Sequence, residues 1–230
     1  FYTVGPELVR GTWVQYTWMT LALLTVFMGS MMAYKEKLLK KRLAYSTVSQ
    51  VAYILFGLSV LNESGMMGAL SHFVFHSVVK NGLFLAAGAV IYKTGRKTVG
   101  ELGGIGKEMP VTMWCFTLAS ITLVGIPPTS GFISKWYLAM GSLRAGTGFF
   151  TWLGPVILLL SAMLTAGYLL PVSIKAFFPG SDYDYEALQK KEPNLLMTIP
   201  MVLYAAAALL LGMFPGAFMG FLQNLAAGLF

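Results

Sequence analysis

Residues 66–92 of this chain read MMGALSHFVFHSVVKNGLFLAAGAVIY, and this apolar stretch contains three titratable side chains, His72, His76 and Lys80. At about 1.5 Å per residue, the stretch is roughly 40 Å long as a helix, which is enough to cross a bilayer. Lys80 lies near its middle, so its amine cannot easily extend to the membrane surface. A lysine at the bilayer centre costs about 3 kcal/mol on insertion scales, and such residues usually mark an ion or proton path.

The composition of the whole chain is typical of a membrane protein. Hydrophobic residues make up 57% of its 230 residues, and charged residues make up only 11%. The net charge of +7 comes largely from short basic blocks between apolar segments, at 35–42 and 93–97, and not from a surface suited to nucleic acid. By the positive-inside rule both blocks lie on the cytoplasmic side. We therefore predict a multi-pass protein of the cell inner (cytoplasmic) membrane, with the lipid bilayer as its surroundings.

The apolar segments predict an all-α, polytopic transmembrane helical bundle that forms one domain over 1–230. The segment 110–125 meets Pro127 and Pro128, which remove backbone donors and break the helix. Freed backbone groups inside a membrane must be satisfied by protein or water, so we expect a hydrated break beside a transport site. A polar loop at 179–193 precedes the last span, and the tail 216–230 suits either a short span or an interfacial helix. The expected helices cover about 12–34, 43–62, 66–92, 110–125, 132–143, 152–178 and 195–213.

The spacing of His72, His76 and Lys80 is four residues, which places them in one polar stripe along a helix. Two histidines at this spacing can share a zinc ion, but no acidic residue lies nearby in sequence, and a lysine one turn on would repel the metal. The plainer alternative is that the histidines make hydrogen bonds between packed helices. Lysine, unlike arginine, releases its proton when it is desolvated, so the stripe favours proton carriage. We predict no metal and no cofactor.

Lys135 repeats this pattern in the helix after the proline break, although it lies close enough to the break to contact water there. None of the nine acidic residues lies within an apolar span, so a buried, charged lysine has no partner in this chain. We expect the counter-charge to come from another subunit or from sequence outside these 230 residues. The single Cys115 allows no internal disulfide, and we expect no catalytic residue and no redox chemistry in this chain. The chain opens on Phe1 without a signal peptide, which leads us to expect a piece of a longer protein.

Three motifs stand out: KKRLAYSTVSQ at 40–50, HFVFHSVVK at 72–80 and GIPPTSGFISK at 125–135. In this order they resemble the C-terminal half of the antiporter-like membrane subunits of respiratory complex I, membrane-bound hydrogenases and multisubunit Na+/H+ antiporters. The likeness covers about residues 12–178. It implies two inverted five-helix repeats in the whole subunit, each with a broken helix, and a central axis of lysines, histidines and water.

The resemblance also implies a role for each titratable residue. Lys80 corresponds to the central lysine of the axis, and His72 and His76 correspond to the histidines that connect to it. Lys135 corresponds to the lysine, or its acidic substitute, that communicates with the exit side or with the neighbouring subunit. The N-terminal half of the family supplies a glutamate–lysine pair that this chain lacks, so transport by these residues alone is not expected.

Supporting roles follow for residues on the adjacent helices. Lys40 resembles a residue at the cytoplasmic entrance, and Pro127 and Pro128 form the break. Ser46 and Ser49, in the polar third of the helix expected at 43–62, are candidates to line a channel, although hydrogen bonding between helices would equally explain such residues.

The sequence therefore predicts a proton-translocating membrane subunit of an NADH-quinone oxidoreductase-like or related redox-driven complex, with other membrane subunits as partners. Two alternatives stay open. The first is a subunit of a multisubunit Na+/H+ antiporter, which would carry sodium as well as protons. The second is a non-conducting scaffold that anchors a peripheral enzyme arm.

Overall fold

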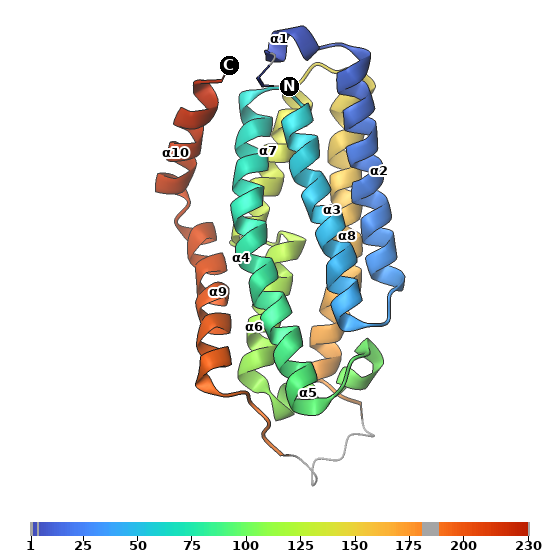
Figure 1. Ribbon diagram of the computed structural model, residues 1–230, viewed down its shortest axis with the longest axis vertical. Helices are drawn as coiled ribbons and strands as arrows, with labels where there is room; N and C mark the ends of the chain where they lie inside the picture. Colours follow the sequence, from blue (N-terminus) through green and yellow to red (C-terminus); the bar gives the residue numbers. More distant parts are fainter. Residues whose placement is uncertain (1, 4, 181–188, 230) are drawn as a thin grey trace.

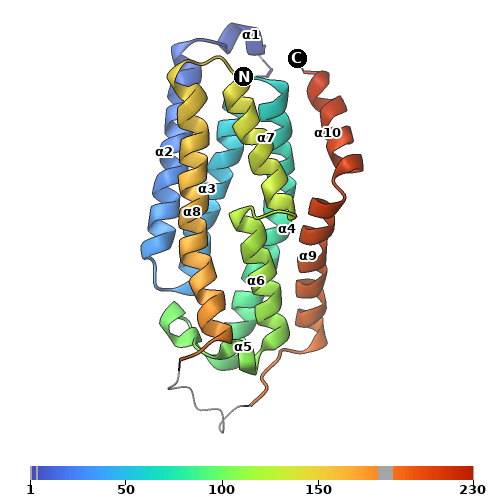
Figure 2. The same ribbon diagram turned by 180° about the vertical axis from the view of Figure 1, so that it is seen from behind.

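The computed structural model of this chain describes residues 2–3, 5–180 and 189–229. It is a bundle of long α-helices that run roughly side by side, as Figures 1 and 2 show from opposite sides. This arrangement confirms the prediction of an all-α transmembrane bundle. Within the described residues, four helices are long and apolar enough to cross a membrane: α2 (Trp13–Lys35), α4 (Glu63–Thr94), α8 (Phe149–Phe177) and α9 (Leu195–Met213).

The helix α3 (Leu39–Ser59) begins four residues before the expected start at 43, inside the first basic block. The reason is Arg42, which donates from Nε to the carbonyl oxygen of Glu36 at 2.9 Å and from Nη1 to that of Tyr168 at 2.8 Å. These bonds hold the first turn of α3 against the end of α2 and the second half of α8. Residues 39–42 of the basic block are therefore helical, and residues 36–38 connect α2 to α3.

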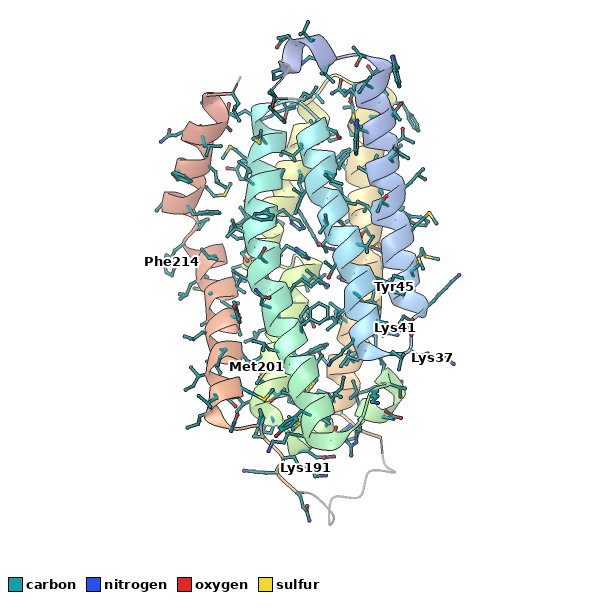
Figure 3. The ribbon with its side chains drawn as sticks, viewed as in Figure 1. Lys37, Lys41, Tyr45, Lys191, Met201 and Phe214 are labelled. Atoms are coloured by element: carbon teal, nitrogen blue, oxygen red, sulfur yellow. The ribbon has the colours of Figure 1, made fainter. Side chains whose placement is uncertain are left out.

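The two basic blocks meet at one end of the bundle, which we call the basic end; it is the lower end in Figure 1. Residues 37–39 and 97–99 are joined there by backbone hydrogen bonds from Leu39 to Lys97 at 3.0 Å and from Val99 to Lys37 at 2.9 Å. Figure 3 shows Lys37 and Lys41 at this end of the molecule, with Lys191 below them.

The helix α4 begins earlier than the expected 66, because Asn62 caps it. The Asn62 side chain accepts a hydrogen bond from the Gly65 N–H at 2.8 Å and donates another to the Gly141 carbonyl at 2.8 Å. Glu63 and Ser64, which we expected in a turn, therefore belong to the first turn of α4. The helix has 32 residues and ends at Gly95, whose φ of 71° suits glycine.

The proline break predicted in the fold lies between α6 (Pro110–Val124) and α7 (Ser130–Arg144). These two short helices follow each other along the bundle and together run from the basic end to the opposite end (Figure 2). Gly125 ends α6 with a φ of 92°, a conformation that L side chains rarely adopt. The prediction of a proline-broken helix is confirmed.

The tail of the chain makes a second pair of the same kind. The helix α10 (Gly216–Ala227) follows α9 after Phe214 and Pro215 and continues towards the opposite end of the bundle (Figures 1 and 2). Phe214, labelled in Figure 3, lies at the junction. Residues 216–227 therefore extend the path of α9.

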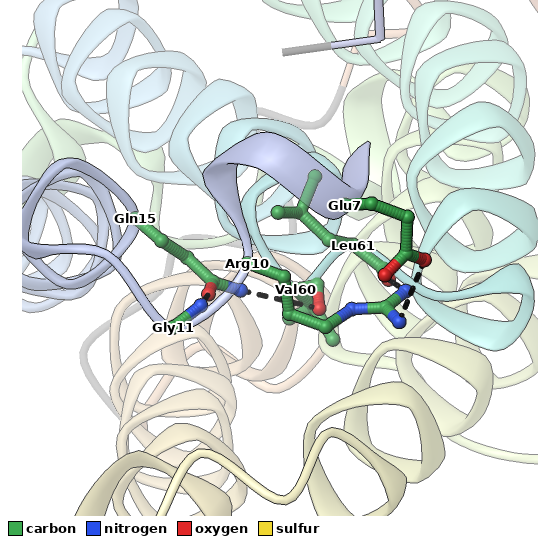
Figure 4. A network of polar contacts seen from close by, with 6 residues as sticks. All are labelled: Glu7, Arg10, Gly11, Gln15, Val60 and Leu61. Carbon is green, nitrogen blue, oxygen red and sulfur yellow. Dashed lines mark hydrogen bonds and ion pairs between the residues drawn. The ribbon is translucent and has the colours of Figure 1, made fainter. Parts of the chain in front are cut away.

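The N-terminal segment closes the end of the bundle opposite the basic end. It contains the short helix α1 (Pro6–Val9). Arg10 pairs with Glu7 at 2.9 Å and donates to the Leu61 carbonyl at 2.9 Å, while Gln15 donates to the Val60 carbonyl at 3.5 Å (Figure 4). These side chains satisfy carbonyls that the end of α3 leaves without partners in its own helix.

At the basic end, connecting segments hold α6 and α9 together. They include a 3-10 helix, Val99–Leu102, and α5 (Ile105–Glu108). The buried Glu108 pairs with Arg96 at 2.8 Å and with Lys191 at 3.3 Å, and Glu192 accepts a hydrogen bond from the Thr112 hydroxyl at 2.7 Å. Of the polar loop expected at 179–193, residues 181–188, with Asp182, Asp184 and Glu186, lie outside the described residues.

Candidate functional site

The titratable stripe of α4 faces the interior of the bundle. Only 2% of His72, 8% of His76 and 5% of Lys80 is exposed. Neighbouring positions on the other side of α4, such as Phe73 and Ser77, are exposed. The four-residue spacing therefore places the three polar side chains on the buried face of a membrane-crossing helix, where each needs a protein partner or water.

His72 joins three helices through its ring. Its Nδ1 lies 2.9 Å from the Ser134 hydroxyl on α7, and its Nε2 lies 3.1 Å from the Gln50 side-chain oxygen on α3. The Tyr53 ring stacks on it with centroids 5.3 Å apart. In the tautomer with the proton on Nε2, the ring donates to the Gln50 oxygen and Nδ1 accepts from the Ser134 hydroxyl. His72 is thus held in position through both ring nitrogens.

His76 lies one turn further along α4, with its ring stacked near that of His72 at 6.0 Å between centroids. Its Nε2 is buried and has no hydrogen-bond partner in the described part of the chain. A cavity of about 10 Å³ lies beside both histidines, lined also by Thr122 and Gly131. A cavity of this size is about the minimum for one water molecule, which would satisfy His76 and connect it to α6.

Lys80 completes the stripe towards the basic end. Its ammonium nitrogen donates to the Leu43 carbonyl of α3 at 2.9 Å, and the Thr47 hydroxyl donates to the same oxygen at 3.0 Å. Among residues 2–3, 5–180 and 189–229, every ion pair uses Glu7 or Glu108, so none reaches this lysine. A neutral carbonyl compensates a buried charge much less than a carboxylate does. The site is therefore suited to an amine that gains and loses its proton.

Lys135 approaches the centre from α7 and bonds to the broken end of α6. Its ammonium nitrogen donates to the Leu123 carbonyl at 2.6 Å and to the Val124 carbonyl at 2.8 Å. The carbonyl end of a helix carries partial negative charge, so a cation is stabilised there. Lys135 also lies over the Tyr53 ring, 5.4 Å from its centroid, which connects it to the ring stacked on His72.

The break, which we expected to be hydrated, is packed closely by protein at Thr129. Thr129 is only 2% exposed, and its hydroxyl donates to the Ile126 carbonyl at 2.7 Å. Gly212 of α9 lies against Pro128 and Thr129, so a side-chain carbon there would collide with the break. Protein groups therefore satisfy the Leu123, Val124 and Ile126 carbonyls, and hydration of the break stays a prediction.

Ser46 and Ser49 lie in a second buried polar cluster, between α2, α3 and α8. The Tyr168 hydroxyl donates to Ser46 at 2.7 Å. The hydroxyls of Ser49 and Ser30 lie 2.8 Å apart, and those of Ser30 and Ser161 lie 2.6 Å apart. These bonds fit the packing explanation as well as the channel explanation, because the contacts between α3 and the stripe in the described residues come from Leu43, Gln50 and Tyr53.

The remaining predicted residues lie outside this buried network. Lys40 is exposed at the basic end, beside Lys41 and Lys97. Pro127 and Pro128 form the connection between α6 and α7, and both are exposed on its outer side. Lys135, in contrast, borders a cavity of about 330 Å³ between α6, α7 and α8 that opens on the side of the bundle.

Two important partners of the stripe were missed in the sequence. Tyr53 stacks on His72, and Ser134 bonds to it, yet neither was a candidate. One signal was available for Tyr53, because it lies three residues after Gln50 and so on the same face of α3. Ser134 directly precedes Lys135, but nothing in its own segment indicates that it faces α4.

Comparisons with known proteins agree with this geometry. The family model described as "NADH:quinone oxidoreductase/Mrp antiporter, TM" matches residues 3–177. NADH-quinone oxidoreductase subunit N of Desulforudis audaxviator is 37% identical over an alignment of 224 residues that covers 93% of this chain and 44% of that protein. A Na(+)/H(+) antiporter subunit of Bacillus subtilis is 33% identical over 191 residues, covering 83% of this chain and 36% of that protein.

A solved structure gives the same picture in three dimensions. A chain of respiratory complex I from Thermus thermophilus superposes with a TM-score of 0.82 at 27% identity, over 94% of this chain and 44% of that one. The chain described here therefore spans less than half the length of the relatives it matches.

Proposed function

Because the chain belongs to the family of NADH:quinone oxidoreductase and Mrp antiporter membrane subunits, we propose that it forms the C-terminal proton-conducting half of such a subunit. In this proposal Lys80 loads and releases a proton, His72 and His76 connect it to the centre of the bundle, and Lys135 passes the proton onward. One observation carries the proposal: Lys80 is buried, and its amine bonds to a carbonyl oxygen. No carboxylate among the described residues pairs with it.

The energetics favour transport over a structural role for Lys80. An uncompensated amine in a membrane interior destabilises the fold, whereas an apolar side chain of similar size would not. A non-conducting scaffold would gain nothing from a lysine at this position. Proton transfer, in contrast, needs an amine whose charged state has little support.

The counter-charge belongs to this proposal as well. The side cavity next to Lys135 offers a route by which a carboxylate of a neighbouring subunit would approach its amine. A carboxylate arriving there would favour the charged form of Lys135 and draw a proton from the stripe. The partners in this proposal are other membrane subunits of a multisubunit complex, and protons are the transported ions.

The parent complex is proposed to be redox-driven and of the NADH-quinone oxidoreductase type, located in the cell inner membrane. The likeness to subunit N, at 37% identity over 93% of the chain, supports this assignment. The likeness to the Na(+)/H(+) antiporter subunit of Bacillus subtilis supports a second candidate, in which the same stripe would serve proton exchange against sodium. Purification of the full-length subunit with its partners distinguishes the two, because only the first yields a quinone reductase.

The test of proton conduction is Lys80→Ala in the full-length subunit, assembled in its parent complex and reconstituted in vesicles. We expect assembly to persist and proton pumping to fall by at least about tenfold, because positioned proton carriers contribute at least that much. Lys93→Ala, an exposed lysine near the end of the same helix, is the matched control and should pump normally. Normal pumping by Lys80→Ala would overturn the proposal.

A further inference from the structure

A surface feature at the basic end lies outside the buried network of His72, His76, Lys80 and Lys135. At the basic end, a small pocket of about 170 Å³ is lined by Lys40 and Lys41 of α3, Lys97 of the following loop, and the apolar Leu38 and Ile91. None of the three lysines belongs to an ion pair in the described part of the chain. Three unpaired amines around one hollow make a site for an anion.

The nearby carboxylates do not neutralise this pocket. Glu36 accepts hydrogen bonds from the backbone N–H groups of Lys37 and Leu38, both at 2.9 Å. Glu101 accepts from the N–H groups of Lys97 and Thr98 at 2.9 and 3.0 Å. The Leu38 N–H lowers the pKa of the Glu36 carboxyl, and the Thr98 N–H lowers the pKa of the Glu101 carboxyl. Both carboxyls stay ionised and are directed at the backbone. Lys41 interacts electrostatically with Glu36, but none of the three lysine amines forms an ion pair within the described residues.

A second, apolar groove lies further along α3, towards the middle of the bundle. It has a volume of about 560 Å³ and lies along α3 with contributions from α2 and α4, lined by Thr25, Ala44, Thr47, Val48, Val51, Ala52, Leu55 and Phe84. Several of these side chains are exposed, including Val48 at 50% and Val51 at 42%.

The pocket and the groove share the same faces of both helices. Lys41, Ala44, Val48, Val51 and Leu55 follow one another at intervals of three or four residues, so they form one stripe of α3. On α4, Ile91 of the pocket and Phe84 of the groove are seven residues, or two turns, apart. Figure 3 shows Lys41 at the basic end of α3, with Tyr45 one turn above it.

The length and chemistry of this combined surface match one class of ligand. From Lys41 to Leu55 the helix rises about 21 Å, which is comparable to the depth of one leaflet of a bilayer. We propose that the surface binds an anionic phospholipid of the leaflet at the basic end, with the phosphate among Lys40, Lys41 and Lys97 and an acyl chain along Val48 and Val51. Basic pockets at this membrane level are suited to such headgroups. This inference does not depend on the proposed function.

The experiment uses the full-length subunit in its parent complex, in nanodiscs of phosphatidylcholine that contain a phosphatidylglycerol with a photoactivatable acyl chain. After illumination, mass spectrometry maps the labelled residues. We expect labelling to centre on residues 44–55 and 84. The triple change of Lys40, Lys41 and Lys97 to Gln should reduce it by at least about tenfold, because each basic residue near an anionic headgroup strengthens binding severalfold.

The matched control changes Lys35, Lys37 and Lys93 to Gln, which removes the same charge from the same end but leaves the pocket lining intact. It should keep full labelling. The pair Val48→Trp and Val51→Trp fills the groove and should lose labelling with all lysines present. If the triple variant does not assemble, Lys97→Gln against Lys93→Gln makes the same comparison.

Three results would overturn the proposal. Equal labelling by a photoactivatable phosphatidylcholine would mean that the groove contacts bulk lipid without selection. Equal loss of labelling in the two lysine triples would mean that only overall charge matters. Cross-links from residues 44–55 to another subunit instead of lipid would assign the groove to a protein interface.

Discussion

At the scale of single residues, His72 is the most constrained member of the buried stripe. Both of its ring nitrogens have partners, Ser134 and Gln50, on two different helices. His76 Nε2 has no hydrogen-bond partner among the described residues and lies beside a small cavity. A proton that moves along the stripe must therefore pass one fixed ring and one ring with room to reorient or bind water. This asymmetry predicts that the two histidines act as a coupled pair.

The change of both histidines to Ala tests this coupling in vesicles with the assembled complex. We expect the double variant to pump more slowly than either single variant, yet with a combined loss smaller than the product of the single losses, because residues in one network are not additive. Ser77→Ala, on the exposed side of α4, serves as the control. If each single change lowers the pumping rate only slightly, and the double change lowers it by the product of the two single effects, a packing role for both rings is favoured instead.

The sequence could predict the stripe but not its partners, and the reason is physical. Four-residue spacing alone puts His72, His76 and Lys80 on one helical face. The bonds to Gln50 and Ser134, in contrast, span 22 and 62 residues and depend on which helices become neighbours. No local pattern contains that information, so Ser134 could not be predicted as a partner of His72.

At the scale of helices, Lys135 stabilises the end of α6 and has a proposed role in proton transfer, and substitutions can separate the two. Its amine satisfies the carbonyls of Leu123 and Val124 at the end of α6, and it stands next to the stripe. This capping contact satisfies two of the carbonyls that the break frees inside the membrane. The sequence showed the break through Pro127 and Pro128 but did not reveal what satisfies its carbonyls.

Lys135→Met should remove both functions, because it leaves two carbonyls without a donor at a cost of about 1–3 kcal/mol each. We expect a lower Tm of the assembled complex and a loss of pumping. Lys135→Arg keeps donors at the cap but holds its proton, so it should preserve much of the Tm while pumping is still lost. Lys175→Met, at the end of α8, is the control. An arginine variant that pumps normally would show that Lys135 caps α6 and does not transfer a proton.

The packing of α9 on the break gives an independent test of the fold. A methyl group on Gly212 would collide with the backbone of Pro128, Thr129 and Ser130, whereas a methyl group on Gly88 of α4 meets no atom within 4 Å. Gly212→Ala should therefore destabilise the complex by about 1–3 kcal/mol, and Gly88→Ala should not. Thermal dissociation followed by size-exclusion chromatography measures the difference. Equal Tm values would mean that α9 does not hold the break.

At the scale of the whole molecule, most of the architecture could be predicted because hydrophobic segments and basic blocks alternate along the chain. The observed helix ends differ where a long-range polar contact overrides local pattern, as Arg42 does for α3 and Asn62 for α4. The course of 216–227 could not be decided from the sequence, because a short apolar segment suits both a span and an interfacial helix. Its position after α9 depends on packing against the rest of the bundle.

Among the described residues, the bundle buries Lys80 and partly buries Lys135, and carbonyl oxygens accept hydrogen bonds from both amines. Such an arrangement is costly unless the lysines lose their protons during function. The central claim is therefore that Lys80 must change its protonation state, and not merely hold positive charge.

Lys80→Arg tests this claim most directly, because arginine keeps the charge but does not release its proton. The measurement is proton uptake by vesicles that contain the assembled complex, relative to its driving reaction. We predict that the arginine variant assembles and that its pumping falls to the level of Lys80→Ala. Pumping at the wild-type rate would contradict the account, because it would show that a fixed positive charge is sufficient.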